Sequence, residues 1–261
     1  MTKKNKYAFT FTVDDNIRVF KEIAQSGYDS IFEHPYLAMY KRLHDDLGIK
    51  VQLNLFYRTD GFTLSEFSDR YSVEFSKNSD WLKLSFHSDH ENVRPYEFSS
   101  YEEVFSDAKK VNSEILRFAG ESSLAKTTTV HYCLATPDGV RAISDNGVLG
   151  LLGLYGKNQN PSISYSLSQE DADTLCTGVS ITRDNITHAA LDIVLNVFEK
   201  EEILRKLSVL YGRALIKIMI HEQYFYSDYT RYQKDFEEKV RKAAESLIEN
   251  GYESVFFEET L

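Results

Sequence analysis

Short apolar runs with the composition of buried β-strands alternate with helical patterns along almost the whole chain. FTFTV, KVQLNLFY, WLKLSFH and LIKIMIH are rich in β-branched and aromatic residues. Alternating strands and helices are typical of βα units packed around a parallel sheet. Strands are expected at 7–13, 50–57, 81–87, 127–133, 147–155, 190–198, 215–221 and 253–258.

The helical patterns between these strands have recognisable ends. Several end on glycine, which favours the left-handed conformation that closes a helix. With 261 residues, 42% of them apolar, the chain can bury a full core, and no linker divides it, so residues 1–261 are expected to form one domain. The economical architecture is α/β, a barrel of seven or eight βα units. Helices are expected at 35–48, 100–120, 136–147, 199–212 and about 228–250, whereas 158–185 has no regular pattern.

Composition argues against several classes of partner. Forty acidic against 30 basic residues give a net charge of -10, which disfavours nucleic acid. No run approaches 18 apolar residues and the first residues lack a secretory signal pattern, so no membrane association is expected. Cys133 and Cys176 form no disulfide framework, which fits a reducing compartment, and a cytoplasmic location is expected.

Four of the expected strands end on residue types that bind metals or transfer protons. In βα barrels the carboxyl ends of the strands form the mouth of the active site, so these residues are expected to converge. A single histidine or aspartate pair at a strand end is more often structural, but four coinciding ends favour a functional cluster. In chain order the residues are Asp14 and Asp15, His87 with His90 and Glu91 after it, His131, and His221 with Glu222.

Asp14 and Asp15 are adjacent like charges at the end of a strand that looks buried. Neighbouring side chains of a regular strand point to opposite faces, so both can serve one site only where the strand gives way to a loop. A bound divalent cation would remove their repulsion and hold both ionised. The pair therefore indicates a cation site.

The order of these motifs resembles the polysaccharide deacetylase family, the chitooligosaccharide deacetylase-like esterases of carbohydrate esterase family 4. The matching stretches TVDD, WLKLSFHSDHEN, TTVHYCLATPDG and IKIMIHEQ span nearly the whole chain. The resemblance implies a distorted (β/α)7-8 TIM-like barrel of the glycoside hydrolase/deacetylase type. It also implies hydrolysis of an acetamide or ester by a metal-activated water.

The resemblance also implies roles for individual residues. The two aspartates of the family's TFDD motif, a general base and a metal ligand, correspond to Asp14 and Asp15. A metal-binding histidine falls on His87, and the general acid of a late Leu-x-Leu-His motif falls on His221. The expected cofactor is a divalent metal ion, zinc first, with nickel, cobalt, iron and manganese as alternatives.

The third metal ligand departs from the family pattern. The second histidine should stand four residues after His87, where Glu91 is found, with His90 one place early. The arginine-containing motif after the fourth strand is replaced by HYCLATPDG, with His131 near the place of the arginine. His131 either orients the catalytic aspartate or completes a set with Asp15 and His87. We prefer the ligand role, because three ligands on rigid strand ends give an open site, and keep His90 and Glu91 as alternates.

Tyr132, Tyr224 and Glu222 are expected to contact substrate, although the tyrosines could equally serve packing. The expected substrate is a small molecule or oligosaccharide, such as an N-acetylated sugar, and the oligomeric state leaves no trace in the sequence. Two alternatives stay open. One is a metal-free glycoside hydrolase that pairs Asp14 or Asp15 with Glu222, and the other is a non-catalytic barrel that binds carbohydrate.

Overall fold

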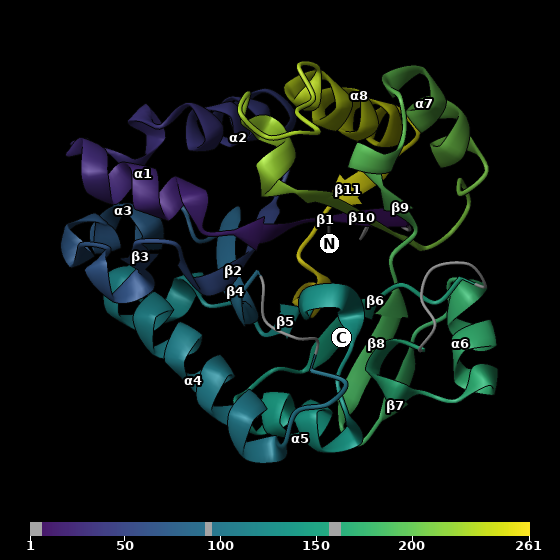
Figure 1. Cartoon of the computed structure of the whole chain (residues 1–261). Coiled ribbons are helices and arrows are strands. Elements are labelled where there is room, and N and C mark those ends of the chain that lie inside the picture. Colours follow the sequence, from purple (N-terminus) through teal and green to yellow (C-terminus); the bar gives the residue numbers. More distant parts are fainter. Residues whose placement is uncertain (1–6, 92–95, 157–162) are drawn as a thin grey trace, which may run out of the picture.

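The computed structural model describes residues 7–91, 96–156 and 163–261, with strands at the centre and helices around them (Figure 1). The strands are β1 (Tyr7–Asn16), β2 (Val51–Thr59), β3 (Phe62–Thr63), β4 (Leu82–His90), β5 (Thr127–Thr128), β6 (Gly150–Gly153), β7 (Ile181–Arg183), β8 (Ile186–Ala190), β9 (Ile193–Val194), β10 (Leu215–His221) and β11 (Tyr252–Ser254).

The strands form two sheets that follow the circuit of a barrel. The larger sheet has the order β3-β2-β1-β10-β9, with β4 paired to β2 and β11 to β1, and the smaller has the order β5-β6-β8-β7. The pairs β2–β3 and β7–β8 are antiparallel, and the others are parallel. A bridge between Leu84 and Leu124 brings β4 to the segment that leads into β5. This arrangement confirms the expected α/β class with a distorted, barrel-like sheet.

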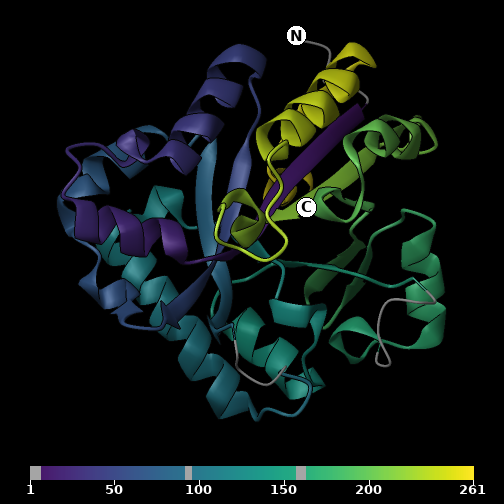
Figure 2. The ribbon, with the colours of Figure 1, turned by 45° about the horizontal axis from the view of Figure 1, so that its top comes forward.

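Eight α-helices of the described chain cover the outer side of the strands (Figures 1 and 2). Their ends follow from local sequence: Ser100 and Glu103 form a reciprocal capping box, and Gly27 and Gly48 close helices in the left-handed conformation. Within the described residues, no helix combines the length and apolar character needed to cross a membrane. The helices are α1 (Arg18–Ser26), α2 (Pro35–Leu47), α3 (Ser72–Lys77), α4 (Tyr101–Phe118), α5 (Pro137–Asp145), α6 (Gln169–Cys176), α7 (Lys200–Ser208) and α8 (Phe236–Glu249).

Both faces of the central strands are buried, but the two faces differ in chemistry. In β1, Phe9, Phe11 and Val13 alternate with Thr10 and Thr12, and all five are at most 3% exposed. The apolar set packs on the helices; the ring of Phe11, for example, lies 6.3 Å from that of Tyr40 in α2. The polar set continues to the end of the strand, so the fold carries hydrogen-bonding side chains to the site.

Four of the expected strands are much shorter than predicted, and two of these, expected at 147–155 and 253–258, are represented by β6 and β11. The strand predicted at 127–133 ends at Thr128, and the chain turns at 131–133, where Tyr132 has a φ of 60°. The strand predicted at 190–198 is represented by β9 alone, preceded by the unexpected β8. Apolar residues continue past the last paired residue in 127–133 and 190–198, where Cys133 and Leu195 are buried but Tyr132 and Val197 are exposed, so composition does not mark where pairing stops.

Helical structure also departs from expectation in four places, the first of which is α3, where no helix was expected. Helix α1 occupies a segment where none was expected, and α6 lies inside the unassigned stretch 158–185, of which 158–162 lies outside the described residues. The last helix begins at Phe236 rather than near Asp228. Successive backbone hydrogen bonds from Tyr229 to Tyr226 and from Tyr232 to Tyr229 fold the intervening segment into turns.

Candidate metal centre

The end of β1 departs from regular strand geometry at Asp15. Its φ is 65°, and the pairing of β1 with β2 shifts register between Val13 and Asn16. Such a conformation of a non-glycine residue costs about 1–3 kcal/mol and is found where function requires it. The irregularity allows Asp14 and Asp15 to line one cavity although they are adjacent in sequence.

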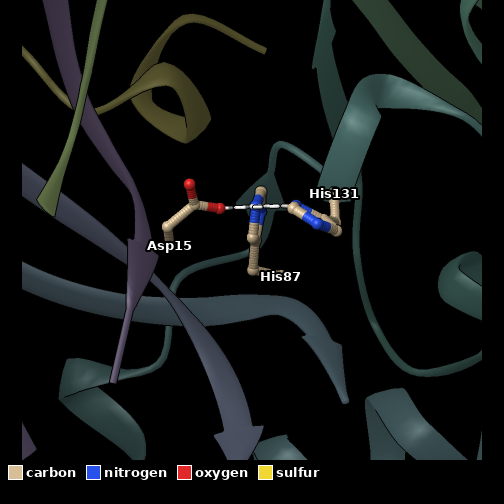
Figure 3. Close-up of side chains that lie close together, drawn as sticks. All are labelled: Asp15, His87 and His131. Carbon is tan, nitrogen blue, oxygen red and sulfur yellow. Dashed lines mark hydrogen bonds and ion pairs between the residues drawn. The ribbon is translucent and has the colours of Figure 1, made fainter. Parts of the chain in front are cut away.

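Asp15, His87 and His131 point toward one another (Figure 3). Oδ1 of Asp15 lies 3.1 Å from Nε2 of His87 and 3.3 Å from Nδ1 of His131, and the two nitrogens are 3.3 Å apart. A tetrahedral metal site with bonds of about 2.0–2.1 Å has edges of about 3.3 Å. The three atoms therefore form a triangle of the size of one face of such a site. A search of the described residues for clustered His, Cys, Asp and Glu finds this group.

Backbone carbonyls orient both imidazole rings. Nδ1 of His87 is hydrogen-bonded to the carbonyl of Thr129, and Nε2 of His131 lies 3.0 Å from the carbonyl of Glu91. A carbonyl only accepts, so each outer nitrogen carries the hydrogen and the inner nitrogen of a neutral ring presents a lone pair. Two lone pairs and a carboxylate oxygen at this separation repel unless a cation joins them. Second-shell carbonyls hold metal-binding histidines in this way, and the donor set fits a divalent transition metal.

The pKa shifts show that the triangle favours positive charge. Burial opposes ionisation of Asp15, but the rings of His131 and His87, when protonated at their inner nitrogens, donate hydrogen bonds that outweigh burial and hold the pKa of the Asp15 carboxyl well below its usual range. Burial also disfavours the charged form of His87, yet the two aspartates raise the pKa of its ring overall. Protons and a metal ion would therefore compete for the same place.

Asp14 lies beside the triangle and is 2% exposed. Its Oδ1 accepts a hydrogen bond of 2.6 Å from Nδ2 of Asn54 in β2. Burial raises the pKa of Asp14, against the opposing effect of two nearby histidines and Asn54. A carboxylate with a raised pKa beside a cation site is suited to accepting a proton.

His221 ends β10 directly opposite Asp14 in the β1–β10 pairing. Its Nδ1 lies 2.9 Å from Oδ1 of Asn196, and the same oxygen accepts the backbone N–H of His221 at 3.2 Å. Because an amide oxygen accepts, Nδ1 carries a hydrogen and Nε2 is the nitrogen left for a substrate. Asp14 and His221 are thus two candidate proton-transfer groups at paired strand ends.

Two adjoining cavities lie at these strand ends. The first, of about 530 Å³, contains the triangle, Asp14 and His221, and also has Tyr132, Tyr224 and Tyr229 in its wall. The second, of about 580 Å³, runs along α1. Both are lined by Asp15, Glu91, Gln223 and Tyr229, so they form one groove across the site. Volumes of this size accommodate small ligands and sugar units.

The carboxylate of Glu222 is occupied by the fold. Glu222 is 1% exposed, and it accepts backbone N–H groups of Ile17, Arg18 and Val19 at 2.8–3.1 Å and the hydroxyl of Tyr226 at 2.9 Å. The first N–H groups of a helix have no partner within it, and Glu222 supplies one for α1. Burial raises the pKa of Glu222 to about 7, although these donors oppose the shift. The carboxylate of Glu222 thus holds the start of α1; the residue also lines the second cavity, and the expected substrate contact stays a prediction.

The alternates for the third ligand lie outside the triangle. His90 ends β4 opposite Arg58, and Glu91 has an exposed side chain. Glu91 contributes its backbone carbonyl, which orients His131. The structure therefore brings together Asp15, His87 and His131, the preferred set.

Three amide side chains at the site were not anticipated from the sequence. Asn54 bonds Asp14, Gln223 donates to Oδ2 of Asp15 at 2.7 Å, and Asn196 orients His221. Asn54 could have been predicted from the sequence, because it is a polar residue in the apolar run KVQLNLFY, as expected for the inner face of a strand. The other two lie in short 3-10 turns, whose side-chain directions no periodicity predicts.

Comparison with known proteins finds similar structures but no similar sequences. No family model matches the chain, and no curated protein is significantly similar in sequence. Among solved structures, a 4-alpha-glucanotransferase from Thermococcus litoralis matches 98% of this chain with a TM-score of 0.64 and 14% identity, but the chain spans only 40% of that protein.

Two structures of carbohydrate esterase family 4 are similar over nearly the whole chain. An acetyl xylan esterase from Clostridium thermocellum, solved with a cobalt ion, matches 97% of this chain and 89% of its own, with a TM-score of 0.55 and 13% identity. A pseudoenzyme from Bacillus anthracis matches 98% of this chain and 65% of its own, with a TM-score of 0.55 and 10% identity. The chain thus has a divergent polysaccharide deacetylase-like fold, in agreement with the sequence resemblance.

Proposed function

We propose that the chain is a metal-dependent hydrolase that removes an acyl group from an N-acylated sugar or a related amide. The observation that carries the proposal is the triangle of Asp15, His87 and His131, with both outer ring nitrogens held by backbone carbonyls. The likeness of the fold to an esterase that holds cobalt supports it. A divalent cation at the triangle would lower the pKa of water from about 15.7 toward 7 and polarise an acyl carbonyl.

The chain's own residues would move the protons. Asp14 is buried, held by Asn54, and placed beside the ligand residue Asp15, so it would accept the proton of the attacking water. His221 would donate a proton to the departing amine through Nε2, with Asn196 holding the ring. The water oxygen bonds to the acyl carbon, the carbon–nitrogen bond breaks, and the products are a carboxylic acid and a free amine.

The groove beside the triangle would hold the substrate. Tyr132 is 52% exposed and Tyr224 is partly buried, and both line the cavity that contains the acid–base pair. Tyrosine rings in such positions bind the apolar faces of sugars while their hydroxyl groups remain hydrated. A small N-acetylated sugar or oligosaccharide is the substrate class that we propose.

The metal-free glycoside hydrolase finds less support at this site. It needs two available carboxylates, and Glu222 is bonded to three backbone N–H groups and a tyrosine hydroxyl. A non-catalytic barrel would retain the groove without turnover, as a fold shared with a pseudoenzyme allows.

The test is metal content by elemental analysis on protein purified without an affinity tag, before and after incubation with Zn, Ni, Co and Mn. We expect about one ion per chain, lost in Asp15→Ala without loss of fold. Asp14→Asn should retain the ion and reduce the release of acetate from N-acetyl sugars by about a hundredfold or more. Stoichiometric metal in Asp15→Ala would refute the ligand set, and metal without turnover in the native chain would favour the non-catalytic barrel.

A further inference from the structure

Gln223 divides the two oxygens of Asp15 between different partners. It follows β10 in a short 3-10 turn, and its Nε2 donates to Oδ2 of Asp15 at 2.7 Å. The other oxygen, Oδ1, is the one that faces His87 and His131. A carboxylate held at one oxygen by a donor presents a single, fixed oxygen to a metal ion. Free rotation of the Asp15 side chain would instead spread the ligand oxygen over many positions.

The orientation of the Gln223 amide follows from charge. If the amide were reversed, its carbonyl oxygen would lie against the Asp15 carboxylate, and two acceptors would repel. The carbonyl Oε1 of Gln223 is buried and has no hydrogen-bond partner among the described residues. Leaving a buried polar atom unpaired costs stability, so the stability of the fold alone does not explain a glutamine here.

An amide also differs from a charged donor at this position. Lysine or arginine would hold the carboxylate at least as firmly but would place a positive charge beside the metal position. Gln223 donates without neutralising Asp15, so the negative charge of Asp15 remains available to a cation. The neighbouring Asp14 is treated in the same way, with Asn54 as its donor at 2.6 Å.

We propose that Gln223 is a positioning residue for the metal ligand Asp15, reserving Oδ1 for the ion by holding Oδ2. This inference rests on the proposed function and extends it to a residue that neither the motifs nor the fold comparison assigns. It predicts that one substitution at Gln223 affects metal affinity and thermal stability differently. Replacing Gln223 with methionine, which has a similar length, removes the donor but also removes the unpaired carbonyl. Metal binding should weaken while thermal stability changes little, because the loss of the donor to Asp15 and the removal of the unpaired carbonyl act in opposite directions.

The experiment is titration calorimetry with Zn²⁺ and Co²⁺ on the full chain, together with melting temperatures of the metal-free proteins. Gln223→Met should raise the metal Kd about tenfold or more, the range typical of lost contacts to a metal ligand, with little change in the melting temperature. Gln223→Lys keeps a donor but adds charge, and it should raise the Kd further. The absorption bands of bound Co²⁺ should shift in Gln223→Met, because Asp15 is no longer held.

Two matched variants serve as contrasts. Asn54→Leu removes the buried amide from Asp14 rather than from Asp15, and it should change the metal Kd by less than about threefold. Gln169→Met removes a surface glutamine–carboxylate bond to Asp173, 2.9 Å long, far along the chain, and should change nothing. A native Kd in Gln223→Met, or equal losses in Gln223→Met and Asn54→Leu, would overturn the inference.

The outcome also separates this inference from the proposed function. A native chain that binds no divalent ion would contradict both. A native chain that binds the ion, with Asp15→Ala losing it and Gln223→Met retaining it, would leave the proposed function standing and refute the role of Gln223 alone.

Discussion

Asp15 lies at the end of β1 and Glu222 directly follows β10, the strand paired with it, and the fold uses the two carboxylates in opposite ways. The oxygens of Glu222 are taken by the N–H groups that begin α1. One oxygen of Asp15 faces the inner nitrogens of His87 and His131, which present lone pairs when the rings are neutral. A strand-end carboxylate surrounded by backbone donors supports structure, whereas one surrounded by lone pairs needs a cation. The type of neighbour, rather than the position in the barrel, decides the role.

The largest effect that we expect is a loss of metal affinity when one of the two histidines beside Asp15 is removed. His131→Ala deletes one corner of the triangle and should raise the metal Kd on the order of a thousandfold, measured by titration calorimetry. Glu91→Ala is the control, because Glu91 orients His131 through its backbone carbonyl, which the substitution retains. It should change the Kd by less than about twofold. Equal losses in the two variants would make the Glu91 side chain a ligand and undo the distinction between side-chain and backbone roles.

The corresponding change on the other strand should act on stability. Oε2 of Glu222 accepts the N–H groups of Ile17 and Arg18, and Oε1 accepts that of Val19, so in Glu222→Gln the side-chain NH₂ group must face at least one backbone N–H. We expect the free energy of unfolding to fall by about 2 kcal/mol in urea denaturation, because a buried donor loses its acceptor. Glu102→Gln, at an exposed position in the first turn of α4, is the control and should change it by less than about 0.5 kcal/mol. Loss of metal affinity in Glu222→Gln at full stability would place Glu222 in the site instead.

Asp15 and Glu222 also show which features of the site can be predicted from the sequence and which cannot. Residue types at strand ends predicted that Asp14, Asp15, His87, His131 and His221 would gather at one place, and all five line one cavity, because strand periodicity and the geometry of parallel sheets decide where such residues meet. The same reasoning predicted a substrate contact for Glu222 but not its hydrogen bonds to the start of α1, since that helix was not foreseen. Hydrogen-bond partners depend on turns and side-chain directions, and these are tertiary properties that a pattern of residue types does not contain.

The smallest effect concerns protons at the triangle. The ring of His87 has a raised pKa in the folded protein, so as the pH falls it takes up a proton that must leave before an ion can bind. Metal affinity should therefore be highest above neutral pH and fall about tenfold for each pH unit below the pKa of the ring, as one proton is displaced. Titrations from pH 8 to pH 5.5 in buffers of different ionisation enthalpy would measure both the affinity and the number of protons released. Because Glu222 is not a ligand in this account, Glu222→Gln should show the same slope, provided that the measurements are made where it is folded. A metal affinity that does not change with pH would mean that the inner nitrogen of His87 does not bind the ion. The contrast between Asp15 as a metal ligand and Glu222 as a structural carboxylate would then lose its main support.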